Sequence, residues 1–202
     1  MLVLSLDSAS QGCSVCLWRD GVVLALAEET MSRGQDARLI PMVQDVMRES
    51  SFDFTQLDRI AVTCGPGSFT GLRIGLAAAR GIGFAARKPV LGISRFEIYR
   101  AQHHEETLLV ALDSRRDELF TKLYRGTAGG DPRLLTLDEV NALGGIARAG
   151  DVAGCASLQE PEVVTAASLA AKANTDDPAF LPRPLYCRPP DVTIGIGGAG
   201  IS

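Results

Sequence analysis

Short apolar runs separated by polar turns predict a meander of three strands at the start of the chain. The runs cover residues 2–6, 12–18 and 22–27, and each has the length of a strand. Asp20-Gly21 separates the second run from the third and predicts a hairpin turn, because both residue types tolerate positive φ.

The hydrophobic period then changes to that of helices. Apolar residues recur every three and four positions between Asp36 and Glu49 and predict an amphipathic helix; they are Leu39, Ile40, Val43, Val46 and Met47. A strand at 59–63, a Gly/Pro-rich loop at 65–71 and a helix at 70–87 follow, and Pro89 ends that helix. A strand at 90–93 then leads to a capping box at 94–97, which predicts a further helix.

After the polar residues 103–106 the same order of elements begins again. Strands are predicted at 108–112, 118–124 and 133–135, and a capping box at 136–139 predicts a short helix. A strand at 151–155 and a helix at 165–173 complete this half.

The two halves also begin alike, since Leu4–Ser8 parallels Val110–Ser114. Three antiparallel strands followed by α-β-α, used twice, resemble the ribonuclease-H-like duplication of actin, Hsp70 and sugar kinases. We therefore expect an α/β protein with two such domains, each with a mixed sheet led by the meander. The expected boundaries are 1–104 and 105–190, with a flexible tail at 191–202.

Composition and charge narrow the function classes. The 202 residues are 46% hydrophobic and carry a net charge of −4, which indicates a globular chain and argues against RNA or DNA binding by the chain alone. The N-terminus does not resemble a signal peptide and no apolar stretch approaches the ~18 residues of a membrane span, so we expect a cytoplasmic protein with reduced cysteines. Cys13 and Cys16 form a C-x-x-C, but they lie in a predicted strand, whereas a redox pair is expected at a helix start.

Asp7 and Asp113 end the first strand of each half, where related nucleotide-binding folds hold phosphate. Neither Asp-Ser pair is followed directly by glycine, so the sequence predicts a kinase-like frame with a degraded or absent nucleotide pocket. The alternative, an aspartate that hydrogen-bonds its own turn, is equally open.

Other catalytic arrangements find little support. His103 and His104 are adjacent on a predicted helix and point about 100° apart, so they do not form a zinc-binding pair. Ser68 does not lie in a G-x-S-x-G motif, and Cys64 has no evident histidine base. We expect no catalytic residue, no metal and no cofactor.

The loop at 65–71 connects a predicted strand to a predicted helix, which is the geometry of an anion site, but it lacks the Lys-Ser/Thr of a P-loop. A tight turn in which Ser68 or Thr70 caps the helix is the simpler interpretation. The helix carries small residues at four-residue intervals: Gly71, Gly75, Ala79 and Gly83. Such a stripe predicts close approach of another helix, either the first helix of this chain, another subunit, or both.

The run from Cys64 to Gly75 resembles the signature of the TsaB (YeaZ) family; the signature loop is Gly65, Pro66, Gly67, Ser68, Phe69, Thr70 and Gly71. The resemblance extends to 4–8, 39–45, 112–115 and 184–188. It implies two ribonuclease-H-like domains and a non-catalytic partner of TsaD in threonylcarbamoyladenosine synthesis on tRNA. The resemblance also implies that TsaE joins that assembly, that the same face can form a homodimer, and that the chain contacts tRNA only indirectly. Gln35 stands where many members carry histidine, and the second domain is short.

The resemblance places the partner interface on the first two helices. Helical spacing predicts that it runs through Leu39, Val43, Val46, Met47, Gly71, Leu72, Gly75, Leu76, Ala79 and Gly83. The alternative function is an ATP-dependent small-molecule kinase of the same fold, which the missing phosphate glycines disfavour.

Overall fold

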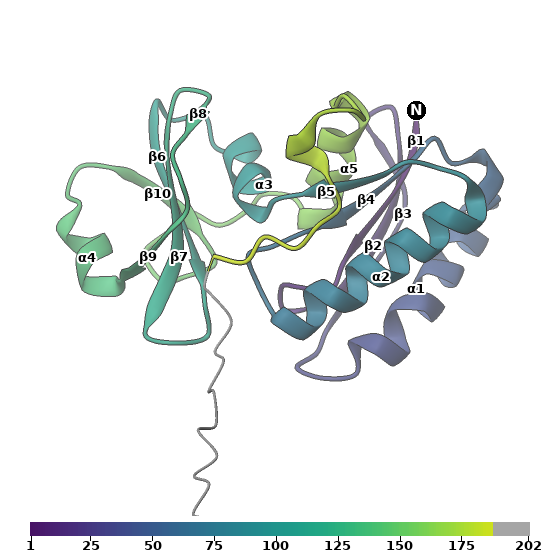
Figure 1. Cartoon of the computed structure of the whole chain (residues 1–202), viewed down its shortest axis with the longest axis horizontal. Coiled ribbons are helices and arrows are strands. Elements are labelled where there is room, and N and C mark those ends of the chain that lie inside the picture. Colours follow the sequence, from purple (N-terminus) through teal and green to yellow (C-terminus); the bar gives the residue numbers. More distant parts are fainter. Residues whose placement is uncertain (188–202) are drawn as a thin grey trace, which may run out of the picture.

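The computed structural model describes residues 1–187, which form two five-stranded sheets with helices around them (Figure 1). The predicted tail at 191–202 lies outside the described residues.

The first sheet has the strand order β3-β2-β1-β4-β5. Its strands are β1 (Leu2–Asp7), β2 (Gly12–Arg19), β3 (Val22–Thr30), β4 (Arg59–Thr63) and β5 (Val90–Ile93). Strand β1 pairs antiparallel with β2 and parallel with β4, so it lies in the middle of the sheet and is buried along its whole length. The predicted hairpin between β2 and β3 is confirmed, with φ of 48° at Asp20 and 94° at Gly21.

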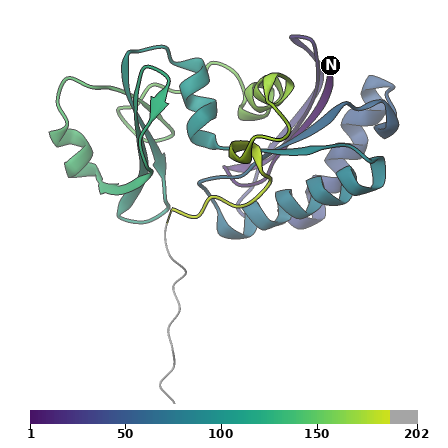
Figure 2. The ribbon, with the colours of Figure 1, turned by 45° about the horizontal axis from the view of Figure 1, so that its top comes forward.

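Helices cover both faces of this sheet (Figures 1 and 2). Helices α1 (Gln35–Ser50) and α2 (Phe69–Ala86) share one core with the leucines of β1, whereas α5 (Glu162–Lys172) shares the other core with Val3. The alternation of side chains along β1 explains why one strand serves both cores.

The second sheet repeats the first in shortened form. It contains β6 (Thr107–Asp113), β7 (Glu118–Arg125), β8 (Ala128–Gly129), β9 (Arg133–Thr136) and β10 (Ala147–Gly150). Strand β6 pairs antiparallel with β7 and parallel with β10, as β1 does with β2 and β4. The predicted fold class is confirmed by this repeated topology.

Helix α3 (Arg95–Gln102) packs on one face of the second sheet, and α4 (Leu137–Ala142) packs on the other. Two 3₁₀ turns, η1 (Phe54–Gln56) and η2 (Pro178–Phe180), complete the described elements. The capping box predicted at Thr136 and Glu139 is confirmed.

The chain returns to the first sheet after it has formed the second. Helix α5 follows β10 in sequence but packs against β1, β2 and β4 and contacts α3. The boundary between residues 104 and 105 stays a prediction, and α5 belongs by its packing to the first sheet although it lies in the segment 105–190.

Three local predictions are wrong. Ser94 caps α3 through the Phe96 N–H, but no capping box forms at 94–97, because the Glu97 carboxylate accepts hydrogen bonds from Lys122 and Tyr124 instead. The strand expected at 151–155 is instead β10 at Ala147–Gly150, whose Ala-Arg-Ala-Gly sequence lacks the β-branched residues that signal a strand. His103 and His104 follow α3 rather than lying in it, because the chain is extended at His103.

Candidate functional site

The signature loop joins β4 to α2, as the sequence predicts. Gly65 has a φ of 101°, which favours glycine, and the Ser68 side chain accepts a hydrogen bond from the Gly71 N–H at 3.2 Å. The prediction that Ser68 caps the helix is therefore confirmed.

The loop packs directly on the turn that follows β1. The Ser68 N–H donates to the Ala9 carbonyl at 2.8 Å, and the Ser8 hydroxyl donates to the Gly71 carbonyl at 2.8 Å. A Cβ at Gly71 would lie 1.9 Å from the Ser8 carbonyl oxygen, and a Cβ at Gly67 would lie 2.5 Å from that of Ala9. The glycines of the signature are thus required by backbone packing within the chain.

Asp7 holds the turn that follows its own strand. Its buried carboxylate accepts hydrogen bonds from the Thr63 hydroxyl, the Ser10 hydroxyl and the Ala9 N–H, the last at 3.1 Å. Of the two interpretations left open by the sequence, these contacts favour the structural one for Asp7.

Asp113 is exposed and accepts a hydrogen bond from the Arg115 N–H at 2.6 Å. The Arg115 guanidinium donates to the Ser10 carbonyl at 2.7 Å, so the turns that follow β1 and β6 lie side by side. The fold therefore brings together the two turns that the sequence singled out.

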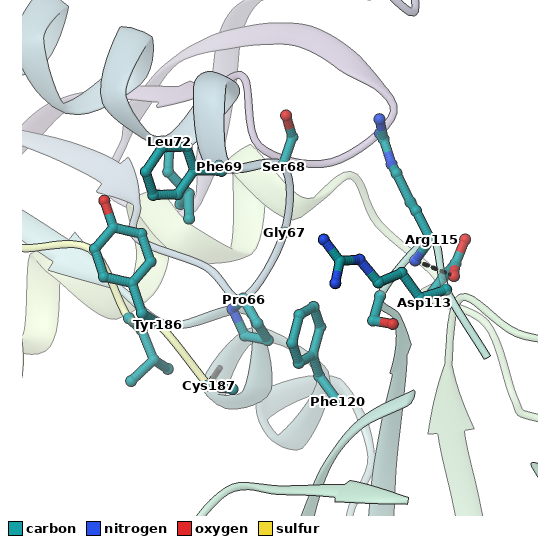
Figure 3. Close-up of a pocket in the computed structure, with 13 residues that line it drawn as sticks. Pro66, Gly67, Ser68, Phe69, Leu72, Asp113, Arg115, Phe120, Tyr186 and Cys187 are labelled. Atoms are coloured by element: carbon teal, nitrogen blue, oxygen red, sulfur yellow. Dashed lines mark hydrogen bonds between the residues drawn. The ribbon is translucent and has the colours of Figure 1, made fainter. Parts of the chain in front are cut away.

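A cavity of about 530 Å³ lies between the signature loop and the turn after β6 (Figure 3). Pro66, Gly67 and Ser68 form one side of it, and Asp113 and Phe120 form the other. Tyr186 and Cys187, from the segment after η2, complete the wall beside Phe69.

Arg95 joins these parts and was not singled out by the sequence. The residue is only 2% exposed. Its guanidinium pairs with Glu162 at 2.6 Å and Asp151 at 2.9 Å and donates to the Pro66 carbonyl at 3.1 Å. Burial lowers the pKa of Arg95, but the two carboxylates raise it further, so it stays well above its ordinary value. Burial raises the pKa of Glu162, and the Arg95 charge opposes that shift.

The cysteines of the C-x-x-C point into different cores. Cys13 packs with the leucines of β1, whereas Cys16 packs on the α5 side of the sheet. Burial raises the pKa of Cys13 to about 11 and that of Cys16 to about 12. Burial likewise raises the pKa of Cys64 to about 12, so its thiol is not an activated nucleophile.

The ten residues expected to form the partner interface are all buried inside this chain, and their role in a partner interface stays a prediction. Leu39, Val43, Val46, Met47, Leu76 and Ala79 belong to the core between the helices and the first sheet, and Leu72 is equally buried. The stripe Gly71, Gly75, Ala79 and Gly83 faces that sheet: a Cβ at Gly75 would lie 2.8 Å from the Ser8 hydroxyl, and one at Gly83 2.3 Å from Val90. The turn after β1 and strand β5, rather than another helix, make the close approach.

The outer side of the same two helices carries a different surface, which we call the α1–α2 seam. Its residues are exposed and uncharged; they are Ile40 and Gln44 on α1 and Ala77, Gly81 and Ala85 on α2. Arg38, on the far side of α1, pairs with Glu29 of β3, so Ile40 and Gln44 lie on the side of α1 that is turned toward α2. A Cβ at Gly81 would have no atom within 4 Å.

Known proteins resemble this chain in sequence and in fold. The chain is 35% identical over 134 residues to the tRNA threonylcarbamoyladenosine biosynthesis protein TsaB of Escherichia coli, and 33% identical over 128 residues to that of Haemophilus influenzae. A family model described as TsaD: tRNA N6-adenosine threonylcarbamoyltransferase matches residues 27–130. The chain belongs to the TsaB (YeaZ) family, within the wider group that this model matches.

The match to these two TsaB proteins covers 64% and 59% of this chain but 58% and 52% of theirs, so the chain spans little more than half their length. An uncharacterised protein of Mycobacterium tuberculosis is 34% identical over 197 residues, which cover 94% of this chain and 92% of that protein. The structure of YeaZ from Pseudomonas aeruginosa shares the fold, with a TM-score of 0.70 and 24% identity over 92% of this chain and 99% of that one.

Two features of other protein classes are absent from residues 1–187 of this TsaB-family chain. Among residues 1–187, no group of three or more His, Cys, Asp or Glu side chains is placed to hold a metal ion. No helix in that part of the chain is long and apolar enough to cross a membrane.

Proposed function

We propose that this TsaB-family chain is a non-catalytic subunit that binds TsaD and supports threonylcarbamoyl transfer to adenosine in tRNA. The names of its TsaB relatives place them in threonylcarbamoyladenosine biosynthesis, and the matching family model carries the name of the transferase. The α1–α2 seam is the observation that carries the proposal, because it offers an exposed, uncharged helical surface to a partner.

The seam has the shape that helix packing requires. Ala77, Gly81 and Ala85 follow each other at four-residue spacing and leave a shallow row along α2. Ile40 is 40% exposed and borders that row from α1. A helix of TsaD can lie close to such a row, since ridges of side chains on one helix fit the grooves of another. A second copy of this chain can use the same seam, and TsaE would join the assembly that TsaD forms.

Internal roles of the other candidate groups agree with a non-catalytic subunit. The Asp7 carboxylate is engaged by Thr63 and Ser10, and burial holds the Cys64 thiol protonated. Neither group is placed to attack a substrate.

The test is Gly81→Leu, measured by titration calorimetry with TsaD from the same organism. The leucine projects into open space and replaces a residue that costs roughly 0.8–1 kcal/mol in a helix, so the melting temperature should stay equal or rise. Within a helical interface it would hold the partner away, and we expect TsaD affinity to fall by at least about tenfold, or ~1.4 kcal/mol.

Gly144→Leu is the matched control. Gly144 is exposed, a Cβ at this position would have no atom within 4 Å, and the residue lies on the second sheet's side of the molecule. The substitution should leave TsaD affinity unchanged. If the unaltered chain does not associate with TsaD, the proposed function fails. If the unaltered chain associates with TsaD and Gly81→Leu binds equally well, the seam is not the interface.

A further inference from the structure

Basic residues are concentrated in one segment of this acidic chain. Residues 59–96 contain six Arg or Lys and no Asp or Glu, although the whole chain has a net charge of −4. Two of the six have internal roles: Arg59 donates to the Ala170 and Ala173 carbonyls, both at 2.6 Å, and Arg95 pairs with Glu162. The remaining four are Arg73, Arg80, Arg87 and Lys88, which we call the basic stripe.

The basic stripe runs along one edge of α2. Arg73 and Arg80 are seven residues apart, which places them on one side of the helix over about 10 Å, and Arg87 caps the C-terminal end of the helix. Arg73 donates to the Tyr186 hydroxyl at 3.4 Å and Arg80 donates to the Pro182 carbonyl, so this edge borders the segment after η2 (Figure 1). Ile74, Ala78 and Ile82 lie along another edge of α2 and pack against the core that α1 shares. The seam residues Ala77, Gly81 and Ala85 lie between these two edges, so the seam adjoins the stripe.

Aromatic rings alternate with these cations. The Arg73 guanidinium lies 3.9 Å from the centre of the Phe69 ring, and the Tyr186 ring lies 5.3 Å from the same ring. At the other end, Phe84 is 90% exposed and lines an open hollow of about 710 Å³ together with Arg80, Arg87 and Lys88. A phenylalanine this exposed has no packing role within the described chain.

We infer that the basic stripe and Phe84 bind a strand of RNA, with phosphates on the arginines and an unpaired base on the Phe84 ring. Proteins hold single-stranded nucleic acid with a row of cations along its phosphate backbone and with aromatic side chains on which its bases stack. The choice of RNA rests on the proposed function. Because the chain as a whole is acidic, the contact is weak in the isolated chain, with a Kd on the order of 10 μM at about 50 mM salt.

The experiment measures fluorescence anisotropy of a labelled tRNA transcript and of a labelled single-stranded RNA, from about 50 to about 200 mM KCl. The first variant is Arg73→Gln/Arg80→Gln/Arg87→Gln. Its control is Arg33→Gln/Arg48→Gln/Arg125→Gln, which removes the same charge from exposed arginines elsewhere. We expect the first triple to lose at least about tenfold in affinity and about two units of salt slope, and the control to lose less than about twofold.

Phe84→Ala separates stacking from charge and keeps the fold, since the side chain is almost fully exposed. It should lower RNA affinity about fivefold or more and leave the salt slope unchanged. Equal losses in the two triples would overturn the proposal, as would normal RNA binding by Phe84→Ala. Stripe-dependent binding to vesicles containing about one-third phosphatidylserine, with no effect on RNA, would assign the stripe to a membrane instead.

The RNA measurements use this chain alone, so they can be interpreted even if the chain does not associate with TsaD. Calorimetry with TsaD on the first triple completes the separation: retained TsaD affinity with lost RNA affinity supports two surfaces on α2. Lost TsaD affinity with unchanged RNA affinity would overturn the assignment of the stripe.

Discussion

At the scale of single residues, burial decides what the cysteines can do. Cys13 and Cys16 are three positions apart on β2, so their side chains emerge on opposite faces of the first sheet. Their thiols cannot meet without breaking the strand, and the C-x-x-C spacing therefore has no redox meaning in this fold.

The raised thiol pKa values give the first residue-scale prediction. Burial raises the pKa of Cys13 and Cys187 from 9.0 to about 11, which lowers the thiolate fraction about a hundredfold at any pH well below 9. Cys16 and Cys64, at about 12, are suppressed further. We expect slow reaction with a thiol reagent at pH 8, a rate that rises about tenfold per pH unit, and half-buried Cys155 as the fastest site.

Mass spectrometry after timed labelling measures these rates, and the unfolded chain in urea is the control in which all five cysteines react. Rapid labelling of Cys13 or Cys16 in the folded chain at pH 8 would contradict this account.

At the scale of elements, the glycines of α2 divide into two groups. Gly71, Gly75 and Gly83 face the first sheet, where a Cβ would meet Ser8 or Val90, whereas Gly81 faces open space. Spacing along the helix shows which residues share a side, but not what lies opposite them. The signature glycines are thus explained by the tight packing of α2 on the sheet.

This division predicts opposite effects of one substitution. Gly71→Ala places a methyl 1.9 Å from the Ser8 carbonyl oxygen, so the helix start or the turn must move, and we expect a loss of about 3 kcal/mol or more. Gly81→Ala should gain roughly 0.5–1 kcal/mol from helix propensity. Urea unfolding of both variants checks the pair, and equal effects would show that α2 is not seated on the turn after β1 as described.

At the scale of the whole molecule, Arg95 connects segments that are far apart in sequence. Its guanidinium contacts the signature loop at Pro66, the residue after β10 at Asp151 and the start of α5 at Glu162. Helix α5 packs on the first sheet, and Asp151 also accepts a hydrogen bond from the Asp113 N–H at the end of β6. This ion cluster therefore links the two sheets to each other.

A double-mutant cycle tests the cluster. Arg95→Leu leaves two carboxylates without their partner in a buried site and should cost about 3–5 kcal/mol. Arg95→Leu/Glu162→Leu should cost less than the sum of the single changes, with a coupling above about 1 kcal/mol in urea unfolding. The exposed Arg48–Asp45 pair is the control, where coupling should stay below about 0.5 kcal/mol. Additive costs at Arg95 and Glu162 would mean that the cluster does not act as a unit.

The sequence by itself determined most of the local structure and the repeat. The β-β-β-α-β-α order, the Asp20-Gly21 hairpin, the Ser68 cap and the capping box at Thr136 are confirmed, because each depends on residues a few positions apart. The signature loop likewise led to the right family, since the motif is long and contiguous.

Only the tertiary structure decided which surfaces face inward. The stripe of small residues on α2 packs on the first sheet, α5 crosses back to that sheet, and Arg95 meets Glu162 across 67 positions. A helical period fixes the angle between side chains but not the object that each side meets, and a buried ion pair leaves no local pattern. The candidate interface therefore moved from the buried side of the helix pair to the seam that the folded chain leaves exposed.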